Sequence, residues 1–532
     1  MSKTLLIGLD GASFDFLMPW IEEGKLPVFK KILQEGTHGI LNSTIPSITC
    51  PALPTIYTGM NPGNLGIFSF LNPDGSVVSS SNIPYKSIWH FLSENNKKSL
   101  ISNLRTTFPP EEINGVMICS LHSIAGKGLG SWENAESHWV YPKELQKELD
   151  GWAVDIDSFT ENVINKILSG DPQGYQNVKQ LEELRASKFK KLLLKADYDF
   201  AFHWIEHTDT MNHLCWGNKK LILKFYQEVI EPIMSDYLNT FKDWNILFIS
   251  DHGAADQVLY DFNINTWLMN NGYLETTWLH KIKLISHILS FAKKHLPYKY
   301  IYSKYFNMKK ELSTTTKEKA ILPNEKNSIL GVNWDNTIAY SDLNWGIRIN
   351  RNKAGDNYEA IREKIISQLK ESKSDSGWNI VQNAWKKEDI YSGKYLDQLP
   401  DIIVLPQNYI KMTKQIFHNE LTQANKSKIG SHFSAINALF MAYGPDIAQH
   451  NIIERSNLYD ILPTILFMLK QEIPKELDGK VLNKIFAEKS EYFNYQAKYT
   501  DETVVRTHQI RDLSDKEEED MKKMLKSLGY FE

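Results

Sequence analysis

Six aspartate and histidine side chains stand at spacings that suit the binding of metal ions. Asp209 and His213 form a D-x-x-x-H pattern, which puts both side chains on one face of a helix. The other four are Asp10, Asp251, His252 and His432. A single aspartate after a strand is more often a helix cap. As a set, however, three aspartates and three histidines predict two mixed nitrogen and oxygen sites of the kind that zinc prefers.

A threonine in a proline-rich segment is the candidate nucleophile. Thr49 lies in TIPSITCPALPTIYTGMNPG, where three prolines restrict the loop. A threonine hydroxyl is a poor nucleophile at neutral pH, and coordination to a metal lowers its pKa and aims the alkoxide. A helix that begins near Pro51 would also point backbone N–H groups at an anion. The alternative interpretation is a proline-rich turn without a function.

The elements that must hold these side chains alternate between strands and helices. We expect apolar strands at residues 4–9, 38–42, 100–103, 116–118, 199–204 and 244–250, and helices between them, for example at residues 26–35, 180–196 and 221–241. This alternation predicts a doubly wound α/β fold, with a mostly parallel central sheet and helices on both faces. Ligands of such sheets bind beyond the carboxyl ends of the strands, and Asp10 and Asp251 follow predicted strands at that edge.

The pattern changes in the middle of the chain. Residues 276–330 are expected to form an inserted helical cap, and strands resume at residues 337–340, 346–350, 401–405 and 438–442. We therefore divide the chain into a first core part (1–275), the cap or lid (276–330), a second core part that contains His432 (331–485) and a C-terminal helical tail (486–532). Residues 281–305 are basic and partly amphipathic, which suits a membrane surface or, the favoured interpretation, a lid with an apolar underside.

The bulk composition restricts the class of protein. The 532 residues are 42% hydrophobic and 23% charged, which is ordinary for a globular protein of one large or two smaller domains. A formal net charge of -4 argues against nucleic-acid binding. The three cysteines show no CxxC spacing and cannot form a disulfide framework. We find neither a signal peptide nor an apolar run of about 18 residues, so we expect a cytoplasmic protein.

Several segments together resemble the type I phosphodiesterase/nucleotide pyrophosphatase branch of the alkaline phosphatase superfamily. In chain order they are LLIGLDGAS, PSITCPALPTIYTGMNPGNLGI, HTDTMNH, ISDHGA, GSHFSAINALFMAYGPDI and YDILPTILFMLKQEIPKELDGKVL. The segments VNWDNTIAY and GIRINR and the closing LGY are similar to those of prokaryotic members. The resemblance spans nearly the whole chain and implies an alkaline phosphatase-like fold.

The resemblance also implies two divalent metal ions, zinc or alternatively manganese, and a role for each candidate residue. The first ion would be held by Asp10, Thr49, Asp251 and His252, and the second by Asp209, His213 and His432. Thr49 would attack phosphorus and form a phospho-enzyme. His207 is the rival of His213 in HTDTMNH, and both the family pattern and the i, i+4 spacing favour His213.

The implied activity is the metal-dependent hydrolysis of phosphodiester or pyrophosphate bonds through a phospho-threonine, in a small substrate such as a nucleotide or a lipid-like molecule. The alternative is a phosphomonoesterase or phosphotransferase on the same two-metal core. An inactive relative that binds a phosphorylated ligand is less favoured, because all seven positions remain. Eukaryotic relatives carry an asparagine that stabilises the phosphoryl oxygens where this chain has Ala52, so another group must serve. Cys50-Pro51-Ala52 does not supply the C/S-x-P-x-R motif of a sulfatase.

Overall fold

The computed structural model describes residues 3–120, 138–153, 156–277, 332–416, 420–425, 430–507 and 510–527. Apart from residues 276 and 277, the predicted cap lies outside these ranges. No helix in the described part of the chain is long and apolar enough to cross a membrane.

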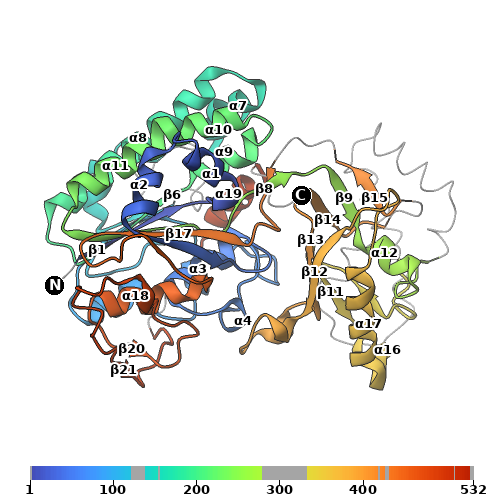
Figure 1. The fold of residues 1–532 in the computed structure, drawn as a ribbon. Coiled ribbons are helices and arrows are strands. Elements are labelled where there is room, and N and C mark those ends of the chain that lie inside the picture. The colour runs from blue at the N-terminus through green and yellow to red at the C-terminus, as the bar shows by residue number, and fades with distance from the viewer. Residues whose placement is uncertain are drawn as a thin grey trace.

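A ten-stranded sheet forms the centre of the larger body (Figure 1). Its strand order is β18 (Asn451–Ile452), β2 (Thr37–Asn42), β17 (Asn437–Tyr443), β7 (Trp244–Ile249), β1 (Lys3–Leu9), β6 (Phe200–Ile205), β3 (Ser99–Leu104), β4 (Gly115–Cys119) and β5 (Val140–Tyr141), and β19 (Ser456–Asn457) also pairs with β2. The strands from β7 to β4 are parallel, whereas β17 and β5 run antiparallel to their neighbours. The sheet therefore confirms the predicted mostly parallel α/β fold.

The middle strands are apolar because both faces of the sheet are covered. In β1 every residue after Lys3 is buried, and β6 is buried throughout, as expected for parallel strands between two helix layers. One layer contains α2 (Pro27–Glu35), α8 (Pro172–Lys195), α10 (Lys219–Phe225) and α11 (Glu231–Thr240). The opposite layer contains α3 (Thr49–Thr58) and α18 (Ile461–Met468), as Figure 1 shows. The helix predicted over residues 221–241 is interrupted by a π-helical turn, Tyr226–Ile230, between α10 and α11.

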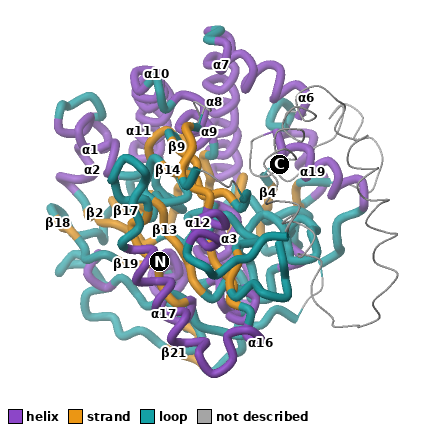
Figure 2. The backbone as a smooth tube through the Cα atoms, turned by 90° about the vertical axis from the view of Figure 1, so that its right-hand side faces the viewer, coloured by secondary structure: helices purple, strands orange, loops and turns teal. Residues whose placement is uncertain are grey.

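A smaller body has sheets and a hydrophobic core of its own, and it faces the viewer in Figure 2. Its four-stranded antiparallel sheet has the order β10 (Ala339–Tyr340), β11 (Gly346–Ile349), β13 (Ile402–Pro406) and β12 (Val381–Lys386), and α17 (Tyr358–Lys370) packs against β12. A second, three-stranded sheet joins β14 (Ile410–Thr413), β9 (Tyr260–Asn263) and β15 (Thr422–Ala424). The chain returns to the central sheet at β17. The division of the chain into domains at residues 275, 330 and 485 stays a prediction. The strands between residues 339 and 413 belong to the two smaller sheets and do not extend the central sheet.

Candidate metal centre

The six predicted metal ligands gather at the carboxyl edge of the central sheet. Asp10 directly follows β1, and Asp251 and His252 follow the neighbouring parallel strand β7. Asp209 and His213 lie on α9 (His207–Cys215), which begins two residues after β6 ends. His432 follows the short strand β16 (Gly430–Ser431), which pairs with β8 (Ala255–Gln257) just beyond β7. Parallel pairing thus brings together side chains that are far apart in the sequence.

These side chains form two groups, each of which could hold a metal ion. Asp10, Asp251 and His252 form one, and Asp209, His213 and His432 the other; within each group the ligand atoms lie within 4.8 Å of one another. In the first group His252 Nε2 lies 3.2 Å from Asp251 Oδ2 and 3.7 Å from Asp10 Oδ1. In the second, His213 Nε2 lies 3.3 Å from Asp209 Oδ2. The rings of His252 and His432 stack at 4.1 Å, so the two groups are adjacent.

All three histidines are oriented by their Nδ1 atoms. Each Nδ1 lies at hydrogen-bonding distance from a backbone carbonyl: His252 from Gly253 (2.8 Å), His213 from Gly430 (2.8 Å) and His432 from Ser47 (2.6 Å). A carbonyl oxygen only accepts, so Nδ1 carries the proton and the lone pair of a neutral ring is on Nε2. Burial, together with the neighbouring His252, lowers the pKa of His432 well below its ordinary value and keeps the ring neutral. Such second contacts are typical of metal-binding histidines.

The three aspartates supply buried oxygens that lack hydrogen-bond donors. Oδ1 of Asp10, Oδ1 of Asp209 and Oδ2 of Asp251 are buried and accept no hydrogen bond from the described residues. Leaving a carboxylate oxygen buried without a partner is costly. Burial, and then the charges of Asp251 and Asp209, raise the pKa of Asp10 well above its ordinary value. A divalent cation in each group would satisfy the oxygens of that group and offset the repulsion between the carboxylates, so the donor set fits metal ions.

Thr49 stands beside the first group, at the start of α3. Its Oγ1 lies 3.1 Å from His252 Nε2, and the side chain is fully buried. The helix begins at Thr49 rather than near Pro51, because Ile48 keeps an extended backbone and Pro51 is accommodated in the first turn, where no N–H is required. The candidate nucleophile is therefore itself the first residue of α3, next to the N–H groups of the first helical turn.

The structure distinguishes His213 from His207, the other histidine considered as a ligand. It also places two residues beside Asp10 that the sequence did not indicate. His207 contacts Glu182 through Nδ1 in a fully buried pair, whereas His213 lies beside Asp209. Trp204 Nε1 donates a hydrogen bond to Asp10 Oδ2 at 3.0 Å. Arg105, which directly follows β3, has its Nη2 atom 4.0 Å from the same oxygen. Only the position of these two residues at the ends of predicted strands could have suggested them.

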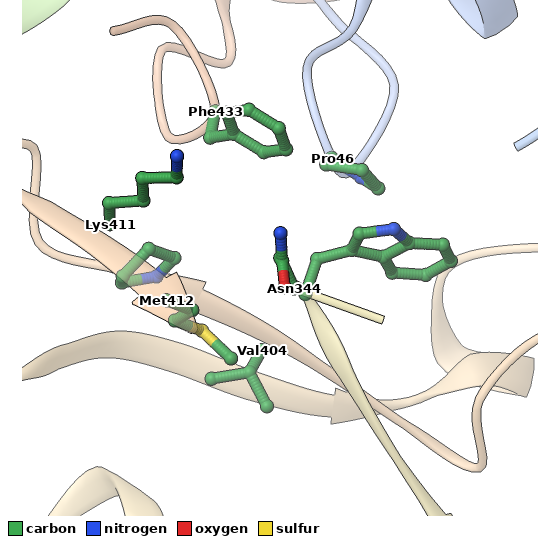
Figure 3. Close-up of a pocket in the computed structure, with 8 residues that line it drawn as sticks. Pro46, Asn344, Val404, Lys411, Met412 and Phe433 are labelled. Atoms are coloured by element: carbon green, nitrogen blue, oxygen red, sulfur yellow. The ribbon is translucent and has the colours of Figure 1, made fainter. Parts of the chain in front are cut away.

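A narrow slot lies between the segments that carry Thr49 and His432 and strands of the smaller body. Pro46 and Phe433, which stand close to Thr49 and His432 in the sequence, form one side, and Val404 and Met412 lie opposite (Figure 3). Asn344 and Lys411 bring polar groups to the same slot (Figure 3). Its volume of about 20 Å³ is room for about one water molecule.

One solved structure shares the fold of this chain, and two others align less closely. Phosphonoacetate hydrolase from Sinorhizobium meliloti 1021, in complex with phosphonoformate, aligns with a TM-score of 0.51 and 14% identity, over 87% of this chain and 94% of that chain. Human ectonucleotide pyrophosphatase/phosphodiesterase 5 aligns with a TM-score of 0.47 and 14% identity, over 90% and 97% of the two chains. The inactive murine protein of that name, in complex with AMP, aligns with a TM-score of 0.46 and 13% identity, over 88% and 96%. No curated protein sequence matches the chain.

A family model provides the assignment. The model described as type I phosphodiesterase / nucleotide pyrophosphatase matches residues 4–428, which include Thr49 and five of the six metal-ligand candidates and end shortly before His432. The match extends over the central sheet up to β7 and over most of the smaller body. The chain therefore belongs to the type I phosphodiesterase/nucleotide pyrophosphatase family and is a phosphoric ester hydrolase.

Proposed function

We propose that the chain hydrolyses phosphodiester or pyrophosphate bonds in a small phosphorylated substrate, with two divalent metal ions and with Thr49 as the nucleophile. The observation that carries this proposal is the position of the Thr49 hydroxyl. It lies 3.1 Å from His252 Nε2, at the first residue of α3 and beside two groups of three metal-ligand candidates. A nucleophile needs this combination of a fixed hydroxyl, nearby cations and backbone donors.

The donor groups indicate which residues would hold each ion. Asp10, Asp251 and His252 would hold one ion together with Thr49, and Asp209, His213 and His432 would hold the other. Mixed imidazole and carboxylate ligands favour zinc, and manganese is the alternative. When bound, the ions lower the pKa of the Thr49 hydroxyl and neutralise charge on the phosphoryl oxygens.

The residues of the chain then position and stabilise the reacting groups. Oγ1 of Thr49 gives up its proton and forms a bond to phosphorus while the bond from phosphorus to the leaving oxygen breaks, and the leaving alcohol or phosphate takes up a proton. The phosphoryl group on Thr49 keeps the remaining ester group of the substrate. Water then attacks phosphorus, the bond to Oγ1 breaks, the remaining phosphate monoester is released and the Thr49 hydroxyl is restored with a proton from the water. The free N–H groups at the start of α3 would stabilise the charge that develops on the phosphoryl oxygens. Thr49 is fully buried, which limits the access of bulk water to the attacking oxygen.

Replacement of Thr49 tests this proposal. Thr49→Ala should keep both metals and lower turnover by roughly three orders of magnitude or more, the scale expected when a nucleophile is removed. Thr49→Ser should retain much of the activity, because the attacking oxygen remains. Acid quenching during turnover, followed by mass spectrometry, should locate the phosphate on Thr49.

Two further variants serve as controls. Thr55→Ala removes another buried threonine from α3, whose hydroxyl donates only to the Pro51 carbonyl, and it should leave turnover close to wild type. Ser47→Ala should be much milder than Thr49→Ala, although it removes a 2.5 Å hydrogen bond to the His432 carbonyl. If Ser47→Ala abolishes turnover and Thr49→Ala does not, the nucleophile is misplaced. Full wild-type turnover in Thr49→Ala would discard the covalent step.

A further inference from the structure

A polar cavity lies in the smaller body, at one end of its four-stranded sheet. β12 ends there beside the start of β13, and β11 is followed there by the short helix α16 (Arg351–Ala354). The cavity has a volume of about 490 Å³, which is in the usual range for a small-molecule pocket. In both Figure 1 and Figure 2, α16 lies far from α9, the helix that carries Asp209 and His213. The cavity is therefore separate from the candidate metal centre.

Lys387 brings a buried ammonium group to the lining of this cavity. The residue is only 3% exposed, and lysine is almost never buried to this extent unless it is paired. Its Nζ atom lies 3.7 Å from Oδ1 of Asp401 and 3.8 Å from Oδ1 of Asp397, which is too far for a hydrogen bond. No described residue accepts a hydrogen bond from this ammonium group. Its three N–H donors are therefore available to a ligand in the cavity.

Arg351 places a second cationic group beside the same carboxylate. Its guanidinium stacks on the ring of Tyr358 at 4.1 Å, and its Nη2 atom donates to the Tyr358 hydroxyl at 3.1 Å. The stacking orders the side chain although it is 63% exposed, and Nη2 lies 3.8 Å from Oδ1 of Asp401. Lys387 and Arg351 thus both approach one carboxylate oxygen, and a small ligand can contact both cations at once.

Two other charged side chains of the cavity already have partners. Asp401 accepts hydrogen bonds from the Tyr358 hydroxyl at 2.6 Å and from the N–H group of Ile349 at 2.8 Å. Arg348 donates to Asp342 at 2.7 Å and also to two backbone carbonyls. The charge of Arg348 is therefore compensated, and the donors that remain for a ligand belong to Lys387 and the outer edge of the Arg351 guanidinium.

We propose that this cavity binds a small organic carboxylate between Lys387 and Arg351. A carboxylate accepts charge-assisted hydrogen bonds from an ammonium group and two parallel ones from a guanidinium. Such bonds would satisfy the buried charge of Lys387, which is costly to leave without a hydrogen bond. Three largely apolar side chains, those of Tyr340, Ile349 and Leu399, also line the cavity and provide contacts for the rest of the ligand.

The charges of the cavity favour a carboxylate over a doubly charged phosphoryl group. Lys387, Arg351 and Asp401 together leave one net positive charge, which a single carboxylate neutralises. A second negative charge on the ligand would stand beside Asp401 without a cation of its own. Asp397 lies fully exposed at the rim, where solvent screens its charge, and it too disfavours a dianion.

Ligand-observed NMR of the full-length, metal-loaded protein tests the site with benzoate and acetate as probes. Both carry the carboxylate, and benzoate adds a flat apolar ring for the apolar wall. We expect benzoate to bind with a Kd of about 1 mM or lower and more tightly than acetate. Sulfate, the doubly charged comparison, should displace benzoate less effectively than acetate does. The readout is binding, so the result does not depend on the proposed function of the metal centre.

Variants of the two cations locate the bound benzoate. Lys387→Met keeps a side chain of similar size and removes the ammonium group, so the Kd of benzoate should rise about tenfold to a hundredfold, the range for a lost hydrogen bond between charged groups. Arg351→Met should also weaken binding. Lys386→Met is the matched control, because the neighbouring Lys386 donates to Glu359 at 3.0 Å and to Glu363 at 2.9 Å and does not line the cavity. This variant should bind benzoate as wild type does.

Three results would overturn the proposal. The first is wild type that binds neither probe at about 10 mM, well above the expected Kd. The second is unchanged benzoate binding in Lys387→Met, which would place the benzoate elsewhere on the protein; if this variant does not fold, unchanged binding in Arg351→Met has the same consequence. The third is displacement of benzoate by sulfate at lower concentration than by acetate, which would exclude the preference for a single negative charge.

Discussion

Gly8 leaves room for the indole that orients Asp10. Gly8 on β1 and Trp204 on β6 are register partners, and Trp204 Nε1 donates to Asp10 Oδ2 at 3.0 Å. A Cβ atom at residue 8 would lie 1.8 Å from Cε3 and 2.2 Å from Cζ3 of that indole. Two carbons cannot approach so closely without a bond, so Gly8→Ala must displace the ring. The substitution therefore acts on the metal centre through a residue that is not itself a ligand.

The expected cost of Gly8→Ala has two parts. Overpacking of a filled core costs roughly 1–3 kcal/mol. Loss of the hydrogen bond to the Asp10 carboxylate adds about 1.5–3 kcal/mol, the range for bonds to charged groups. The sum of about 2.5–6 kcal/mol is a large fraction of the free energy of unfolding of a typical protein. Because Asp10 also loses its orienting partner, the affinity of the first metal site should fall by about tenfold to a hundredfold.

Urea denaturation of the chelated protein and titration with zinc measure these two effects separately. Trp204→Phe removes the N–H and keeps most of the apolar contact, so it should lower metal affinity with a smaller loss of stability. Gly217→Ala is the control, because a Cβ there meets nothing within 4 Å. Wild-type stability and metal affinity in Gly8→Ala would refute the argument that the indole must move and that it orients Asp10.

Three further predictions concern the metal and the pH dependence. Purified protein should carry about two divalent ions per chain and lose its activity on chelation; active, chelator-resistant protein without metal in elemental analysis would contradict the metal assignment. His432→Ala should lower metal occupancy and turnover together, and a variant that keeps both would remove His432 from the ligand set. Burial lowers the pKa of His203 from its ordinary value of 6.5 to about 4. Between pH 6.5 and pH 4 the unfolded state therefore binds more protons than the folded state, and the free energy of unfolding falls as the pH drops. Between pH 7 and pH 5 wild type should lose about 2 kcal/mol more than His203→Gln in urea denaturation, and equal losses would show that His203 is not held neutral by burial.

The sequence by itself determined the elements and the ligand candidates. The apolar run before Asp10 specified a strand buried on both faces, because only the centre of a parallel sheet accepts such a run. The D-x-x-x-H spacing of Asp209 and His213 specified a shared helix face, because the period of a helix is local. The order of the motifs was sufficient to identify the family. These features depend on residues that are near one another along the chain.

The tertiary structure decided what depends on contacts between distant residues. The pairing of β1 with β6 brings Trp204 onto Gly8 and Asp10, and no local pattern specifies that register. Arg105 gave no signal in the sequence beyond its place at the end of a predicted strand, since its approach to Asp10 depends on the positions of β3 and β1 on either side of β6. The sequence placed the strands that resume after residue 331 in a second core part without specifying their partners, and the structure pairs those between residues 339 and 413 in sheets separate from the central one. Local periodicity determines which segments are strands, whereas their partners are selected by the packing of the whole core.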